Sequence, residues 1–358
     1  MDITRDTILA ERLRRQGLLR PVRTHEEYTA LFALIGPVSP TFFSCPGNPP
    51  SITHRADFDD MALAGRFRER RELVKGRFLN KTIGYVLEGD LALYANAFRR
   101  PLEKMTWTQR EVFHALETAG PLTPRQLAEE TGLMNKEIMP ALHRLQEAFL
   151  VYEDQLTTDW ERGWYVFASE WPEITVEEER WVPSASEVLL RFLQGHVFAT
   201  TEQVKDWSGW AGKDVQRLLD GLSARGSVLP VMIDGLGDGW LRAEDAGLPA
   251  ASAPPTVFML HKADPLVRSH ASELKARYHG REVLQYLLID GAFQGAVLGH
   301  WRIGPHDVED IVVELPAKER EARREEIIRA VGWGYRPPFS HILKYAGQGS
   351  GASLTEPV

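Results

Sequence analysis

Two stretches of this chain, 106–167 and 184–241, carry the same succession of secondary-structure signals, and this internal repeat is the strongest constraint on the fold. In the first stretch, three segments have apolar residues at helical spacing, and capping or breaking residues separate them. Thr123, Pro124 and Gln126, for example, form a capping-box signature where the second segment begins. The first stretch therefore predicts helices over 107–116, 124–130 and 136–149, and a hairpin with strands over 150–152 and 164–167.

The second stretch repeats this order and ends in a turn rich in glycine and aspartate. It predicts helices over 184–193, 200–207 and 215–222, and strands over 228–233 and 240–241. Three helices followed by a hairpin is the order of a winged helix, one form of helix-turn-helix unit. Because two copies occur in the same order, chance is a poor explanation of the pattern.

The flanking regions complete the expected architecture. Residues 1–104 predict four helices around a strand pair, which fits a degenerate winged helix, whereas short β runs follow the proline-rich linker 247–256. We expect an α+β protein of tandem winged-helix units with a small C-terminal antiparallel β-barrel. The predicted parts are a winged-helix-like domain at 1–104, winged helices at 105–172 and 173–246, a β-barrel with a C-terminal helix at 256–345, and a disordered tail at 346–358.

The composition excludes several classes of protein. The 358 residues include a single cysteine, Cys45, so no disulfide or cysteine zinc site can form within the chain, and we expect an inert buried thiol. No metal-ligand motif or nucleophile elbow is present, so we expect neither a metal nor a cofactor. No apolar run reaches membrane-spanning length and the first residues lack a signal-peptide core, so we expect a cytoplasmic protein without a membrane partner.

The charge is distributed unevenly along the chain. The net charge is -8, but residues 1–104 carry 17 Lys and Arg against 13 Asp and Glu, while the remaining residues carry 25 against 37. Six cations fall within twelve residues of the basic part: Arg66, Arg68, Arg70, Arg71, Lys75 and Arg77. Such a cluster is either a solvated helix face or a patch that contacts phosphates, and charge alone favours the solvated face.

The winged-helix order adds candidate DNA contacts. A winged helix places its third helix in the major groove of DNA and its hairpin beside the backbone. The candidates on the third helices and the first wing are Asn135, Lys136, Arg144, Arg162, Lys213 and Arg217. The basic residues Arg66, Arg68, Arg70, Lys75 and Arg77 would add phosphate contacts. Winged helices also serve as protein-binding scaffolds, and that alternative stays open.

Four segments carry a family resemblance. They are residues 12–18, residues 73–84 with 88–91, the wing at 161–165, and 263–266 with its Asp-Pro-Leu. In this order they resemble four parts of the AlkZ/YcaQ-type winged-helix DNA glycosylase family: its opening helix, its "R-G-T-L-H … D-L" segment, its wing and its barrel. This family removes alkylated bases and unhooks interstrand crosslinks. The resemblance implies three tandem winged helices plus a barrel, and DNA repair by hydrolysis of the N-glycosidic bond without a metal.

The same resemblance places the family's catalytic residues. Its Gln-x-Gln or Gln-x-Asp pair, which holds the attacking water, matches residues 34–39, where the two polar positions are Gly36 and Val38. The histidine of "T-L-H" matches Gly84. The family motif is thus missing at these positions. The nearest polar residues are Ser39, Thr41, Ser44, Asp57 and Asp59.

Three hypotheses follow. The first is a DNA-binding protein with the glycosylase fold, acting on double-stranded DNA, damaged or intact, whose catalysis is in doubt because the motif is missing. The second is a non-enzymatic regulator or lesion sensor that binds DNA. The third is a winged-helix scaffold that binds protein.

Overall fold

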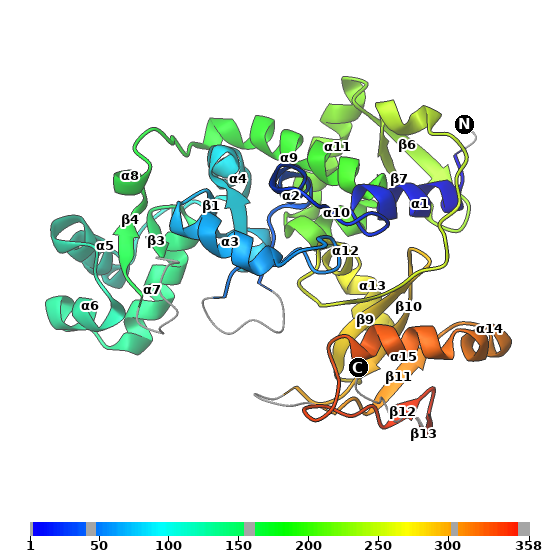
Figure 1. Ribbon diagram of the computed structural model, residues 1–358. Coiled ribbons are helices and arrows are strands. Elements are labelled where there is room, and N and C mark those ends of the chain that lie inside the picture. Colours follow the sequence, from blue (N-terminus) through cyan, green and yellow to red (C-terminus); the bar gives the residue numbers. More distant parts are fainter. Residues whose placement is uncertain (1–2, 41–47, 154–161, 302–306, 350–358) are drawn as a thin grey trace. The chain divides into compact units, whose positions relative to one another are not determined.

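The computed structural model describes residues 3–40, 48–153, 162–301 and 307–349 (Figure 1). Of the residues named above, Thr41, Ser44, Cys45 and Glu161 lie outside this description, as does the chain from residue 350 onward. The chain divides into two compact units. The terminal unit comprises Met1–Leu19, His196–Trp207 and Pro230–Val358, and the central unit comprises Arg20–Gly195 and Ser208–Leu229.

The central unit begins with a small α/β arrangement. Its elements are α2 (His25–Ile35), α3 (Asp60–Glu69), β1 (Leu73–Arg77), β2 (Ile83–Leu87) and α4 (Leu91–Phe98). Thr24 caps α2 by accepting a hydrogen bond from the Glu27 backbone N–H, which satisfies one of the free donors at the helix start. The antiparallel pair β1–β2 sets Gly76 opposite Gly84, and a buried cluster around Tyr28, Phe32 and Tyr85 joins helices and strands.

A three-helix group and a hairpin follow in the central unit. They are α5 (Trp107–Ala119), α6 (Pro124–Thr131), α7 (Asn135–Glu147), β3 (Val151–Glu153) and β4 (Trp164–Val166), and the short helix α8 (Phe167–Glu170) comes next. The capping box predicted at Thr123 and Gln126 is present, and Thr106 with Gln109 forms another. Leu116, Leu142 and Trp164 lie in one buried core, so the hairpin packs on the helices. Three helices followed by a hairpin is the order that the sequence predicted.

The second copy has the same order with one added strand. Its elements are α9 (Trp181–His196), β5 (Phe198–Ala199), α10 (Thr201–Ser208), α11 (Gly212–Ala224), β6 (Val228–Ile233) and β7 (Gly237–Arg242). The sequence did not predict β5, which has only two residues and pairs antiparallel with β7 in the order β5-β7-β6. Such a short strand carries no periodicity of its own, so only its long-range partner defines it.

The terminal unit contains a six-stranded sheet in the order β13-β12-β11-β10-β9-β8. The strands are β8 (Val257–Leu260), β9 (Val283–Ile289), β10 (Ala292–Leu298), β11 (Asp310–Val313), β12 (Lys344–Tyr345) and β13 (Gln348–Gly349). The helices that accompany them are α12 (Pro265–Ser269), α13 (Ala271–Arg277), α14 (Ala317–Ala322) and α15 (Arg324–Gly332).

This sheet differs from the antiparallel barrel predicted for 256–345. Over the residues that the structure describes, the sheet is open, with β8 at one edge and β13 at the other. In addition, β12 runs parallel to β11. The physical reason is the connection, because α14 and α15 lie between β11 and β12 and return the chain in the same direction (Figure 1). Strand β13 includes Gln348, within the tail that the sequence predicted to be disordered.

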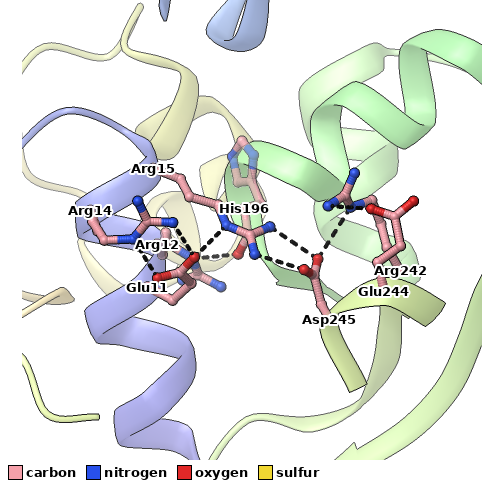
Figure 2. Close-up of polar contacts among 8 residues, drawn as sticks. All are labelled: Glu11, Arg12, Arg14, Arg15, His196, Arg242, Glu244 and Asp245. Atoms are coloured by element: carbon pink, nitrogen blue, oxygen red, sulfur yellow. Dashed lines mark hydrogen bonds and ion pairs between the residues drawn. The ribbon is translucent and has the colours of Figure 1, made fainter. Parts of the chain in front are cut away.

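The first helix, α1 (Arg5–Arg15), belongs to the terminal unit, although the predicted domain 1–104 joined it to the residues that follow. An ionic network fixes it there (Figure 2). Arg15 donates to both carboxylate oxygens of Asp245 at 3.0 and 2.6 Å, and Arg242 donates to the same carboxylate at 3.2 Å. Glu11 accepts from Arg15 at 2.7 Å. Burial opposes ionisation of Asp245, but the hydrogen bonds from both arginines outweigh it and lower the pKa of this carboxyl.

None of the helices in the described ranges combines the length and apolar character that a membrane span needs.

The Asp245 network predicts a stability effect. Asp245→Asn should lower the free energy of unfolding by about 2–3 kcal/mol, because two arginines lose their shared buried counter-charge while each keeps one other carboxylate. Glu244→Gln is the matched control, since it removes the same charge from a carboxylate that is 78% exposed, and it should change stability by less than about 0.5 kcal/mol. Urea unfolding followed by circular dichroism measures both. Equal midpoints for the two variants would contradict the assigned role of Asp245.

Candidate functional site

The three positions that match the family's catalytic residues come together in the central unit. Val38 and Tyr85 form an isolated antiparallel bridge, with backbone N–H···O distances of 3.0 and 2.8 Å in the two directions. Gly84 precedes Tyr85 on β2, and a Cβ added to Gly84 would lie 3.0 Å from the Cβ of Pro37. Residues 36–38 and Gly84 therefore lie next to one another in the central unit.

The packing around Gly36 and Gly84 leaves little space for a larger side chain at either position. A Cβ on Gly36 would lie 3.0 Å from the carbonyl oxygen of Phe32 and 3.6 Å from the hydroxyl of Tyr94. The ring of Phe78 lies 3.6 Å from the corresponding point on Gly84. Val38 is buried in the apolar cluster of the central unit. A glutamine at position 36 or a histidine at position 84 thus has no room without displacement of the backbone or of Pro37.

The polar side chains beside this site hydrogen-bond to backbone carbonyl groups. The Tyr94 hydroxyl donates to the carbonyl of Gly36 at 3.2 Å, and the hydroxyl of Ser39 donates to the carbonyl of Ile83 at 2.9 Å. Burial raises the pKa of Tyr94, so the phenol stays neutral near pH 7. Ser39 was predicted as a polar substitute and does lie here, but its proton is engaged. Neither hydroxyl offers the paired acceptors that would orient a water molecule.

The carboxylates predicted near the site have local partners. Asp59 caps α3 by accepting from the Ala62 backbone N–H at 2.9 Å, and Asp57 pairs with Arg23 at 3.2 Å. The sequence reasoning missed Asp60. Its carboxylate accepts from the Ile52 backbone N–H at 2.7 Å and from the Ser51 hydroxyl at 3.2 Å.

The surroundings of Asp60 shift its protonation equilibrium. Burial raises the pKa of Asp60, and the nearby charge of Asp59 acts in the same direction. A carboxyl group with a raised pKa is a candidate general acid or base. The Asp-Asp pair at the start of a helical pattern was the available signal, but only the fold decides that Asp60 is the less exposed member.

Two of the predicted DNA contacts, Lys75 and Arg162, form an ionic cluster with Glu153, and a third, Arg77, hydrogen-bonds to neutral groups. The ammonium of Lys75 and the guanidinium of Arg162 each lie 2.7 Å from a different oxygen of Glu153. The side chain of Lys75 is only 5% exposed, and burial lowers its pKa to about 8. Arg77 donates to the amide oxygen of Gln146 at 2.9 Å and to the carbonyl of Lys81 at 3.0 Å. These cations thus hold β1, β3 and α7 together.

The arginines of α3 divide between the core and the surface. Arg66 is exposed and has no ion-pair partner within the part of the chain that the structure describes. Arg70 is exposed as well and lies 3.8 Å from Glu72, a weak pair. Arg68 is buried, and its guanidinium lies 3.4 Å from the hydroxyl of Tyr85. Two of the three cations therefore face solvent.

The remaining candidates lie on α7 and α11. Asn135 and Lys136 are exposed in the first turn of α7, and Lys213 is exposed in the first turn of α11. Arg144 donates to the carbonyls of residues 100 and 101 at 2.9 and 2.7 Å, so it fixes the segment before α5. The guanidinium of Arg217 lies 5.0 Å from the ring centre of Trp181, in a cation–π arrangement.

A metal does not fit the described parts of the chain, because no group of three or more His, Cys, Asp and Glu side chains there is arranged to hold one.

Comparisons with known proteins identify the family and the fold. The family profile described as "DNA glycosylase AlkZ-like" matches residues 51–332, and it begins after the stretch 34–39. Among solved structures, the chain is similar to Streptomyces sahachiroi DNA glycosylase AlkZ, with 16% identity and a TM-score of 0.65 over 93% of this chain and 98% of that one. At this identity the similarity shows the fold alone. No curated protein matches the sequence.

The packing around Gly84 predicts that the family's side chain cannot be restored there. Gly84→His should lower the free energy of unfolding by about 1–3 kcal/mol, because the ring must displace Pro37. Gly89→His is the control, since a Cβ at Gly89 meets no atom within 4 Å, and it should stay near wild type. Thermal unfolding of both proteins tests this. A Gly84→His variant as stable as the control would show that the site has room for the histidine.

Proposed function

The chain belongs to the DNA glycosylase AlkZ-like family, and from that premise we propose that it binds DNA with the glycosylase fold but lacks the side chains that position water for base excision. One observation carries this proposal. At the positions of the family's polar pair and histidine, Gly36, Val38 and Gly84 are packed against Pro37, Phe78 and the backbone of Phe32. Hydrolysis needs a positioned water, and no side chain at these positions can hold one.

We assign the repeated segments to winged helices. Residues 105–172 and 173–246 each run through three helices into a hairpin, and residues 1–104 would be a degenerate version. In this assignment α7 and α11 are the helices that face the major groove, with Asn135, Lys136 and Lys213 in their first turns.

The charges favour α3 as the main phosphate contact. Residues 105–172 carry five Lys and Arg against eleven Asp and Glu, so that segment repels DNA except where a cation projects. Residues 1–104 carry the basic excess, and Arg66 and Arg70 are its exposed members on α3. Lys75, Arg77, Arg144 and Arg162 have acceptors within the protein, so they contribute less. The partner is double-stranded DNA, damaged or intact.

The second candidate function is base excision through a different carboxylate. Asp60 favours it, because burial raises its pKa while a backbone N–H and a hydroxyl fix its oxygens. A carboxylate that two hydrogen bonds hold in place can accept a proton from water or stabilise the positive charge that develops on the sugar. The substrate would be an alkylated purine, whose positive charge makes it a good leaving group.

The phosphate-contact role of α3 predicts a change in salt dependence. The double variant Arg66→Glu/Arg70→Glu should weaken binding to a DNA duplex and reduce the slope of log K against log salt by about 2, because two phosphate contacts are lost. Arg125→Glu/Arg110→Glu is the matched control, with the same charge change in the acidic segment, and it should leave the slope unchanged. Gel shifts at 50–200 mM salt measure both. Equal slopes for the two variants would contradict the assignment, and no binding at low salt would favour a protein-binding scaffold.

The closed site predicts the outcome of a glycosylase assay. With a duplex that contains 7-methylguanine, the wild-type chain should release no base above the enzyme-free rate while it still shifts the duplex in a gel. Base release that Asp60→Asn abolishes would establish the second candidate and overturn the first. Asp57→Asn is the control, because that carboxylate is exposed and pairs with Arg23.

A further inference from the structure

A cavity of about 450 Å³ lies within the terminal unit, and the DNA-binding proposal makes no use of it. Residues of α1, α10, α12, α13 and the turn between β9 and β10 line it. Leu9, Leu288 and Phe293 supply apolar surface, and Arg12, Gln203 and His270 supply polar surface. Its volume falls within the range of small-molecule sites, which join apolar walls to a few fixed polar groups.

Arg12 gives the cavity a buried positive charge that pairs with no carboxylate among the residues that the structure describes. Its Nε donates to the carbonyl of His196 and its Nη2 to the carbonyl of Phe198, both at 2.9 Å. Burial lowers the pKa of Arg12 to about 10, so it stays charged near pH 7. Nη1 has no acceptor among the described residues. Figure 2 shows the contrast on α1, where Arg15 is directed at Asp245 and Arg12 at a backbone carbonyl.

The other polar groups deep in the cavity are neutral and already oriented. Gln203 accepts from the Thr200 backbone N–H at 2.9 Å, so its amide N–H₂ donates to Nε2 of His270, also at 2.9 Å. The other ring nitrogen, Nδ1, then carries the proton and donates to the carbonyl of Leu266. Burial holds the pKa of His270 at about 4, so the imidazole is uncharged near pH 7. Arg12 is therefore the inner cation of this cavity.

The outer part of the cavity carries the opposite charge. Glu273 and Glu314 both pair with Arg277, so one guanidinium serves two carboxylates. Their side chains are 49% and 38% exposed, whereas Arg12 is 4% exposed, which places the carboxylates nearer the solvent. The lining also includes Arg5, Glu202 and Asp206, so apart from Arg12 it carries four carboxylates against two guanidinium groups. An excess negative charge thus surrounds the buried positive charge of Arg12.

We propose that this cavity binds a hydrophobic α-amino acid, with its carboxylate on Arg12, its ammonium group between Glu273 and Glu314, and its side chain against Leu9, Leu288 and Phe293. A simple anion would gain Arg12 but meet the outer carboxylates, and a simple amine would leave Arg12 without a counter-charge. A zwitterion satisfies both ends at once. The site does not depend on DNA binding.

Isothermal titration of the full chain with L-phenylalanine, L-leucine and L-methionine tests the ligand class. We expect at least one of them to bind, and its amide, which lacks the carboxylate, and its N-acetyl form, which lacks the ammonium group, to bind at least tenfold more weakly. Binding of none of the three at millimolar concentration would overturn the proposal. Equal affinity of the modified forms would also overturn it.

Variants locate the site. Glu273→Gln should weaken the amino acid at least tenfold, whereas Glu244→Gln, which removes the same charge outside the cavity, should leave the affinity unchanged. Glu273 is half exposed and should tolerate the change without loss of fold, which the unfolding midpoint checks. If both variants bind equally well, the ammonium contact is wrong. Gel shifts with DNA on the same proteins keep this result separate from the DNA-binding proposal.

Discussion

Two backbone hydrogen bonds between Val38 and Tyr85 fix the position of the segment that follows α2 in the central unit. They tie the segment after α2 to β2 and so bring Pro37 against Gly84. A Cβ on Gly36 or Gly84 would lie 3.0 Å from its nearest neighbour, so a larger side chain at either position requires that neighbour to shift. In the same unit, Asp60 is a partly buried carboxylate that hydrogen bonds from Ile52 and Ser51 hold in place.

Burial divides the basic residues into two classes with different roles. Lys75 and Arg162 share the carboxylate of Glu153, and removal of that carboxylate would take the shared counter-charge from two largely buried cations. Such cations contribute to stability and have little freedom to meet a phosphate. Arg66 and Arg70 keep their freedom because α3 presents them to solvent. The acidic net charge of the chain is thus compatible with DNA binding, since a few exposed cations with local basic surroundings determine the phosphate contact.

The sequence predicted what local signals determine. Helix capping at Thr123 predicts where α6 begins, and the apolar spacing of Leu142 and Leu145 predicts α7. Both helices lie where the sequence predicted them. It could not predict pairings set by distant residues, such as β12 beside β11 or Glu153 beside Lys75. The candidate site shows the same division. The resemblance named Gly36, Val38 and Gly84 as motif positions, but their proximity and the burial of Lys75 depend on the whole fold.

Two arginines of the first helix show that the charge of a residue and its position in a motif do not determine its role. Arg12 and Arg15 belong to one arginine-rich segment, and both are largely buried in the terminal unit. Arg15 lies on the side of α1 that faces Asp245, where two N–H groups meet two oxygens, and this pair holds the helix in place (Figure 2). Arg12, three residues earlier on the helix, meets only carbonyl oxygens, which are dipoles and carry no net charge. The guanidinium of Arg12 therefore still attracts any anionic group that can reach it, and the cavity gives such a group access.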